Sequence, residues 1–141
     1  RASGATLGRT TVALAGAAPG LFSSEDAVLA VSPTGELLSP GPGIPRGSVV
    51  TLYATGSGAW DVARVAGAPP AAPLGAPLAP VTLRIGNSPA EILYAGEAPG
   101  LAGVLQLNVR VPGIFTAPGK HEAVLRVGAA ASPEGFTLQL N

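Results

Sequence analysis

The sequence contains no cysteine and no methionine, and charged residues make up 11% and aromatic residues 4% of its 141 positions. The absence of cysteine excludes a disulfide framework and thiolate metal sites, but it leaves the cellular compartment open. Globular proteins are on average about 25% charged. A surface with so little charge is either unspecialised or is covered by a partner.

The sequence also lacks an excess of either charge. Eight basic and eight acidic residues give a formal net charge of zero and are scattered singly. Nucleic acids and anionic lipids are bound by clustered lysine and arginine, so the sequence disfavours both partners. No apolar run approaches the roughly 18–20 residues that cross a bilayer, and we expect no transmembrane segment. No charged-then-apolar leader precedes Arg1, so we expect that a signal was removed or that the sequence begins here.

Apolar residues, glycine and proline are abundant instead: 47% of the chain is hydrophobic, with 20 glycines and 15 prolines. A chain of this length forms one domain that buries about two-thirds of its unfolded surface and needs no cofactor to fold. We expect a domain over residues 17–141, preceded by a strand-like N-terminal extension over residues 1–16.

The stretch from Pro80 to Pro112 shows the expected architecture most plainly. Leu105 to Val111 alternates apolar and polar residues, which is typical of a strand with one face in a core and one in water. Val81 to Ile85 and Ala90 to Tyr94 alternate in the same way, and the turn-forming residues between them predict a hairpin.

Similar patterns predict further strands elsewhere in the chain, at Asp26 to Ser32, Glu36 to Leu38, Ser48 to Thr55, His121 to Gly128 and Glu134 to Asn141. Ala59 to Pro80 is rich in proline and alanine and exceeds the roughly 12–15 residues of an ordinary connection. We expect it to be an extended polyproline segment that runs along the outside or covers a sheet edge. About nine short strands and no helix predict an all-β, immunoglobulin-like antiparallel β-sandwich with a long Pro/Ala-rich loop.

These segments resemble a known family, the uncharacterised C-terminal domain of the Solibacter type found in large secreted proteins of Acidobacteria. The resemblance is carried by Ala18 to Phe22, Gly47 to Gly56, Pro89 to Gly100 and Leu105 to Pro112, in that order. It implies export and an immunoglobulin-like module, which in the family is attached to other domains. No activity is established for the family, so the resemblance implies no catalytic residues.

The residues with reactive side chains do not form a catalytic or metal-binding pattern. His121 is the only histidine, and no acidic or histidine partners cluster around it in the sequence. Gly56-Ser57-Gly58 is too short to cradle a phosphate and opens no helix, so it predicts a turn at a strand end. We therefore expect no enzyme, no cofactor and no metal ion.

Three aromatic residues, Trp60, Tyr53 and Tyr94, are candidates for a platform on which sugar rings stack. The alternative is that Tyr53 and Tyr94 are core or rim residues of strands, since each lies within an expected strand. A platform would make the protein a secreted adhesion module that binds a polysaccharide or a surface protein.

The N-terminal extension suggests a different function. Its apolar and β-branched segment consists of Thr10, Thr11, Val12, Ala13 and Leu14. One hypothesis is that this strand completes the sheet of a neighbouring copy, which would link copies head to tail into a filament. The other is that it is the first strand of its own sandwich. The sequence thus favours a non-enzymatic extracellular structural or assembly module whose partners are copies of itself, at the cell surface or secreted.

Overall fold

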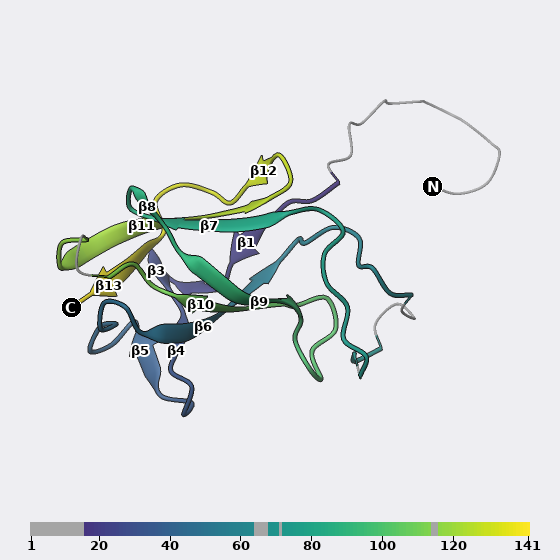
Figure 1. Cartoon of the computed structure of the whole chain (residues 1–141), viewed down its shortest axis with the longest axis horizontal. Coiled ribbons are helices and arrows are strands. Elements are labelled where there is room, and N and C mark those ends of the chain that lie inside the picture. The colour runs from purple at the N-terminus through teal and green to yellow at the C-terminus, as the bar shows by residue number, and fades with distance from the viewer. Residues whose placement is uncertain (1–15, 64–67, 71, 114–115) are drawn as a thin grey trace.

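The computed structural model describes residues 16–63, 68–70, 72–113 and 116–141. In these ranges the chain forms two β-sheets that pack face to face (Figure 1). One layer contains β7 (Val81–Ile85) and β11 (Gly119–Val127), and the other contains β6 (Val49–Thr55) and β10 (Leu105–Arg110). The described ranges contain strands and turns but no helix. The structure is therefore an all-β sandwich, as the alternating pattern of the sequence predicts.

The first sheet has the order β5-β4-β6-β10-β9. β1 pairs with the C-terminal end of β6, on the side away from β10 that β4 also occupies. All pairings in this sheet are antiparallel. Its strands are β1 (Gly20–Leu21), β4 (Ala30–Val31), β5 (Leu37–Ser39), β6 (Val49–Thr55), β9 (Glu91–Glu97) and β10 (Leu105–Arg110).

The second sheet has the order β2-β3-β13-β11-β7-β8, and β12 pairs with the C-terminal end of β11. The pairing of β13 with β3 is parallel, at Thr137 and Ala27. The sequence predicts a purely antiparallel sandwich, and this pairing departs from that prediction. The strands of the second sheet are β2 (Ser23–Ser24), β3 (Ala27–Val28), β7 (Val81–Ile85), β8 (Ser88–Pro89), β11 (Gly119–Val127), β12 (Ala130–Ala131) and β13 (Thr137–Leu140).

The core lies between the sheets and is built from alternate residues of the long strands. Every second residue of β6 and β10 is fully buried, and the residues between them are at least partly exposed. The buried side chains are Val50, Leu52 and Ala54 of β6, Leu105, Leu107 and Val109 of β10, Leu83 and Ile85 of β7, Ala123, Leu125 and Val127 of β11, and Leu138 and Leu140 of β13. The first sheet therefore has one face in the core and one face in water, as the sequence predicts.

The predicted hairpin between Val81 to Ile85 and Ala90 to Tyr94 is wrong in part. The turn is present, but it pairs β7 with the short β8. The chain then crosses at Ala90, and β9 joins β10 in the other sheet. Alternation predicts which residues face the core, but not which of the two sheets a strand joins, because both sheets bury the same kind of residue. The immunoglobulin-like order of connections stays a prediction.

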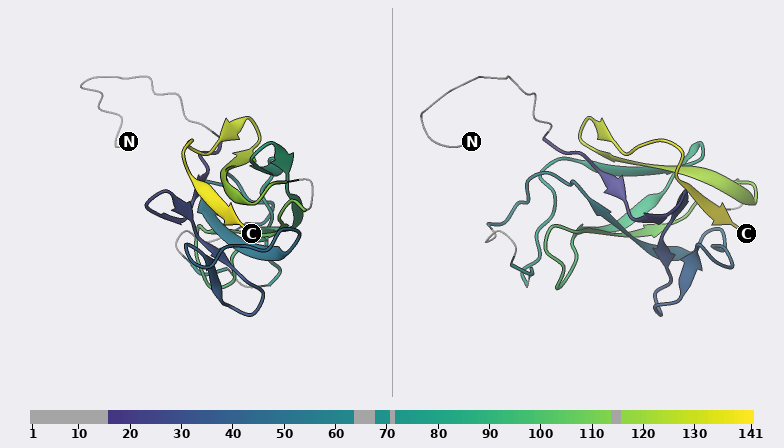
Figure 2. Two further views of the ribbon diagram at one scale, coloured as in Figure 1. Left: turned by 90° about the vertical axis from the view of Figure 1, so that its left-hand side faces the viewer. Right: turned by 180° about the vertical axis from the view of Figure 1, so that it is seen from behind.

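The Pro/Ala-rich loop is shaped by its own pairing. Its two ends form a short ribbon: Asp61 N–H donates to the Ala76 carbonyl, and Leu78 N–H donates to the Ala59 carbonyl, each over 2.9 Å. The loop and the turn between β9 and β10 extend from the same end of the sandwich in both views (Figures 1 and 2). Glu97 N–H donates to the Gly75 carbonyl, so the loop covers the end of edge strand β9.

Candidate functional site

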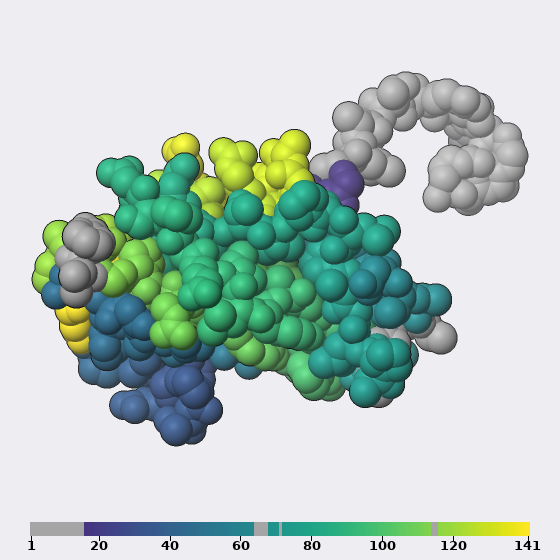
Figure 3. All heavy atoms as spheres, viewed as in Figure 1, coloured from purple at the N-terminus to yellow at the C-terminus, as the bar shows by residue number. Residues whose placement is uncertain are grey.

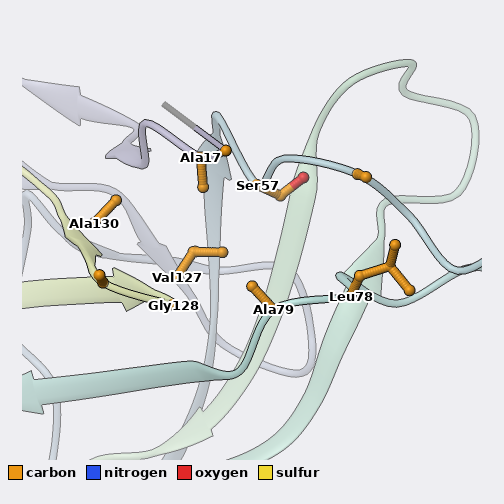
Figure 4. Close-up of a pocket in the computed structure, with 10 residues that line it drawn as sticks. Ala17, Ser57, Leu78, Ala79, Val127, Gly128 and Ala130 are labelled. Atoms are coloured by element: carbon orange, nitrogen blue, oxygen red, sulfur yellow. The ribbon is translucent and has the colours of Figure 1, made fainter. Parts of the chain in front are cut away.

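An apolar opening of about 560 Å³ separates the two sheets at one corner of the sandwich. In Figure 4 the side chains of Ala17, Ala79 and Val127 point toward one another, while Leu78 points away from them. Figure 3 shows the start of the described chain, in purple, beside the yellow-green surface around β12. We call this opening the corner groove, and it is lined by Gly16, Ala17, Ser57, Ala59, Leu78, Ala79, Val127, Gly128, Ala129 and Ala130.

The corner groove lies between two short edge strands. On the side of the first sheet, β1 pairs with β6 and has no further strand beyond it among the described residues. On the side of the second sheet, β12 pairs with β11 through Ala130 and Ala131. Ser132 N–H donates to the Leu125 carbonyl. Hydrogen-bonded pairs alternate along an antiparallel ladder, so the N–H and C=O of Ala131 point away from β11 toward the open edge.

The Gly56-Ser57-Gly58 turn holds the start of the described chain against the groove. Gly56 and Gly58 both have a φ of +74°. A Cβ at Gly56 would collide with the Ala18 carbonyl, and one at Gly58 would collide with the Gly16 carbonyl. Only glycine combines this backbone conformation with so close an approach. The turn predicted from the sequence therefore also fixes the path of residues 16–18.

The chemistry of the corner groove is that of an apolar binding surface. Its described lining contains no acid, base or histidine, and its one hydroxyl, Ser57 Oγ, lies 3.4 Å from the Gly58 carbonyl. Ala17 and Val127 are buried, whereas Leu78 is 67% exposed at the rim. Such a lining is suited to aliphatic side chains, and none of its described residues other than Ser57 carries a polar side chain.

The assembly residues predicted from the sequence, Thr10 to Leu14, lie outside the described residues. The described chain begins at Gly16, which is itself part of the groove lining. The segment that carries the predicted donor strand is thus joined directly to the corner groove. The structure does not test whether the segment pairs within its own sandwich or with a neighbour.

The three aromatic candidates do not form one platform. Tyr53 of β6 pairs with Gln106 of β10, and Tyr94 of β9 pairs with Asn108 of β10, so both tyrosines lie on the outer face of the first sheet. Both are partly exposed. Trp60 instead pairs with Pro77 in the ribbon of the Pro/Ala-rich loop and packs against the core. The structure therefore brings two of the three together and separates the third.

Tyr94 is held flat along its strand. Its hydroxyl donates to the Glu97 carbonyl over 2.8 Å, and a Cβ at Gly96 would lie 2.8 Å from its Cζ, so the ring covers the glycine. Burial, with a smaller effect from the negative charge of the Glu97 carboxylate, raises the pKa of Tyr94 above its ordinary value.

His121 lies on β11, and its Nε2 is 2.7 Å from the Ala117 carbonyl oxygen. Within the described ranges no three histidine, cysteine, aspartate or glutamate side chains lie close enough together to hold a metal ion. The described residues include no helix long and apolar enough to span a membrane.

Sequence reasoning missed the lining of the corner groove. Its residues come from four separate segments and are mostly glycine and alanine, which are common throughout this chain. No local pattern distinguishes them. The polar residues between the two tyrosines did have a signal, since Gln106 and Asn108 form the wet face of the clearest alternation in the sequence.

No protein-family model, no curated protein and no solved structure matches this chain.

Proposed function

We propose that this protein is a non-enzymatic structural module that assembles by strand addition. Residues Thr10 to Leu14 of one copy enter the corner groove of the next copy and pair with the edge of β12 that faces away from β11. The observation that carries the proposal is an apolar groove between two strand edges to which no other described strand is paired, next to Gly16, where the described residues begin. The resemblance to an exported family supports an extracellular setting.

The donor segment fits the chemistry of the groove. Val12 and Leu14 are separated by one residue and therefore lie on one face of an extended strand. The groove has the volume of a ligand pocket, which is about 300–1,000 Å³, and its lining of small residues leaves room for larger side chains. The strand backbone would add hydrogen bonds to Ala131, as in other cases of an extended segment joining a sheet edge.

A second copy is a better source of this strand than the same chain. Gly16 is fixed at the rim by its close approach to Gly58, so a segment returning to the groove must reverse direction immediately before it. Thr10 to Ala15 contains no glycine, proline, asparagine or aspartate, the residues that tight turns prefer. A strand from a neighbour needs no such reversal. The contact joins two different surfaces of the protein, so its repetition links copies head to tail into a filament.

The expected affinity is modest. Full burial of Val12 and Leu14 contributes about 1.5–3 kcal/mol each, and each backbone hydrogen bond about 0.5–1.5 kcal/mol. Association costs about 4–15 kcal/mol in lost freedom of movement. At the favourable end of these ranges the net free energy of association is about −5 kcal/mol, so assembly should require protein concentrations of about 0.1–1 mM or higher.

Light scattering after size-exclusion chromatography tests the proposal. The mass of the full chain should rise with concentration, while a chain that lacks residues 1–15 should stay folded and monomeric. Leu14→Asp should abolish the rise because it places a charge in the groove. Leu7→Asp, in the same segment but outside the donor strand, is the matched control and should still assemble. A full chain that stays monomeric at the highest concentration would refute the proposal.

A further inference from the structure

The outer face of the first sheet carries a second feature, which does not involve the N-terminal segment. Pairing of β6 with β10 places Thr51 opposite Asn108 and Tyr53 opposite Gln106. Pairing of β10 with β9 places Tyr94 beside Asn108. The neighbours of these residues along β6 and β10 are fully buried, so all five side chains point to the solvent face. We call this group the outer-face strip.

The centre of the outer-face strip is a fixed amide network. Thr51 Oγ1 donates to Asn108 Oδ1 over 3.0 Å, and Gln106 Nε2 donates to the same oxygen over 3.2 Å. Because Oδ1 accepts both bonds, the two N–H groups of Asn108 Nδ2 are left to donate to another molecule. The Gln106 carbonyl oxygen likewise remains able to accept. The strip therefore presents both donors and acceptors in fixed positions.

Aromatic rings lie on both sides of this network. Tyr53 packs against Phe22, with ring centroids 6.3 Å apart and an angle of 37° between the planes. The Tyr94 ring lies along β9 and is held at its hydroxyl by the Glu97 carbonyl. Tyr53 and Tyr94 are two strand spacings apart across the sheet and are offset by two residues along it, which corresponds to about 12 Å at the usual spacings of about 4.8 Å between strands and about 3.4 Å per residue. A ligand that contacts both rings must therefore extend over more than one sugar ring.

The charge of the strip selects against ionic ligands. The nearest cation on this face, Arg110, forms an ion pair with Glu91 at 3.1 Å. It also donates to the Gly47 carbonyl. On the described strands of this face the charge of Arg110 is therefore balanced by Glu91, which gives an anionic polymer little to bind there.

A second copy of the sheet is also a poor match. Sheets that pack face to face interdigitate apolar side chains, whereas the middle of this strip is threonine, glutamine and asparagine. Burying amides without partners is unfavourable. A ligand rich in hydroxyl groups satisfies them, since each hydroxyl both donates and accepts, and the flat apolar side of a sugar ring packs on a tyrosine ring.

From this arrangement we infer that the outer-face strip binds a neutral polysaccharide, with sugar rings against Tyr53 and Tyr94 and hydroxyl groups bonded to Gln106 and Asn108. Neither the corner groove nor strand addition enters this inference. A Leu14→Asp chain that no longer assembles should bind the polysaccharide as the unaltered chain does, so the two proposals fail separately.

Affinity electrophoresis of the full chain tests the inference, with native gels that contain hydroxyethyl cellulose, mixed-linkage β-glucan, galactomannan or dextran, and with alginate as the anionic comparison. At least one neutral polymer should retard the protein, and alginate should not. Asn108→Asp preserves the shape and the acceptor oxygen but removes both free donors, so retardation should fall at least several-fold while circular dichroism stays unchanged. Tyr53→Ala should weaken it as well.

Leu93→Ala is the matched control, because Leu93 is exposed on β9 but has no pairing position in the strip. It should leave retardation unchanged. The inference is overturned if none of the neutral polymers retards the protein, if alginate alone does, or if Asn108→Asp has no effect. It is equally overturned if Asn108→Asp changes the oligomeric state, since the strip would then be a contact between copies.

Discussion

The backbone N–H of Ala18 donates to the Gly56 carbonyl oxygen over 2.9 Å, and this bond fixes the first described residues against the end of β6. It extends the pairing of β1 with β6 beyond the two residues of β1. The same turn brings Gly58 against the Gly16 carbonyl. The start of the described residues is therefore fixed beside the corner groove, as strand addition between copies requires.

Replacing Gly56 with alanine should destabilise the domain. The φ of +74° is strained for alanine, and the new Cβ would collide with the Ala18 carbonyl, which is backbone and cannot swing aside. We expect a loss of about 1–3 kcal/mol in the free energy of unfolding, measured by denaturant titration. Gly113→Ala is the control, because a Cβ there meets nothing within 4 Å. Equal losses in the two variants would contradict this account of the turn.

Gly96→Ala should loosen the contact between the Pro/Ala-rich loop and β9. A Cβ at this position would lie 2.6 Å from the Tyr94 hydroxyl oxygen and 2.7 Å from the Gly75 carbonyl oxygen. We expect a loss of about 1–3 kcal/mol, as for other overpacked sites, together with faster proteolysis within the loop. Unchanged proteolysis in a destabilised variant would show that the loop does not depend on this contact.

Stability should fall at high pH through Tyr94. Burial and then the Glu97 carboxylate raise the pKa of Tyr94 in the folded state above its ordinary value of 10.0. The folded state therefore binds this proton more tightly than the unfolded state, so the contribution is complete below about pH 10 and is lost as the pH rises through the folded pKa.

Denaturant titrations across this pH range, on the unaltered chain and on Tyr94→Phe, measure the contribution. The variant should show a shallower decline. Tyr53→Phe, which retains Tyr94, should decline as steeply as the unaltered chain. If Tyr94→Phe declines as steeply as the unaltered chain, the assignment to Tyr94 is wrong.

The sequence predicts this fold where one strand face is in water and the other is in the core. Leu105 to Val111 matches β10 closely because polar Gln106 and Asn108 separate buried leucines and valines. The two-residue strands β1 and β12 are too short to leave an alternation, since their pairing is set by the neighbouring turns and by β6 and β11.

The two candidate sites also differ in how far the sequence predicts them. The corner groove was not predictable, because it depends on Ala17, Ala79 and Ala130 meeting from distant segments. Tyr53 and Tyr94 were recognised as candidates, but only the register of β10 places them on one face and leaves Trp60 elsewhere.

Mixing two variants, each defective in one half of the contact, tests strand addition most directly. Leu14→Asp removes the donor strand, and Ala131→Pro removes the backbone N–H that faces the open edge of β12, at an exposed residue. Each variant alone should be monomeric by light scattering. Their mixture should form one-to-one dimers, because each pair retains one intact donor and one intact groove, and it should form nothing longer. A mixture that stays monomeric, while the unaltered chain assembles, would contradict the account.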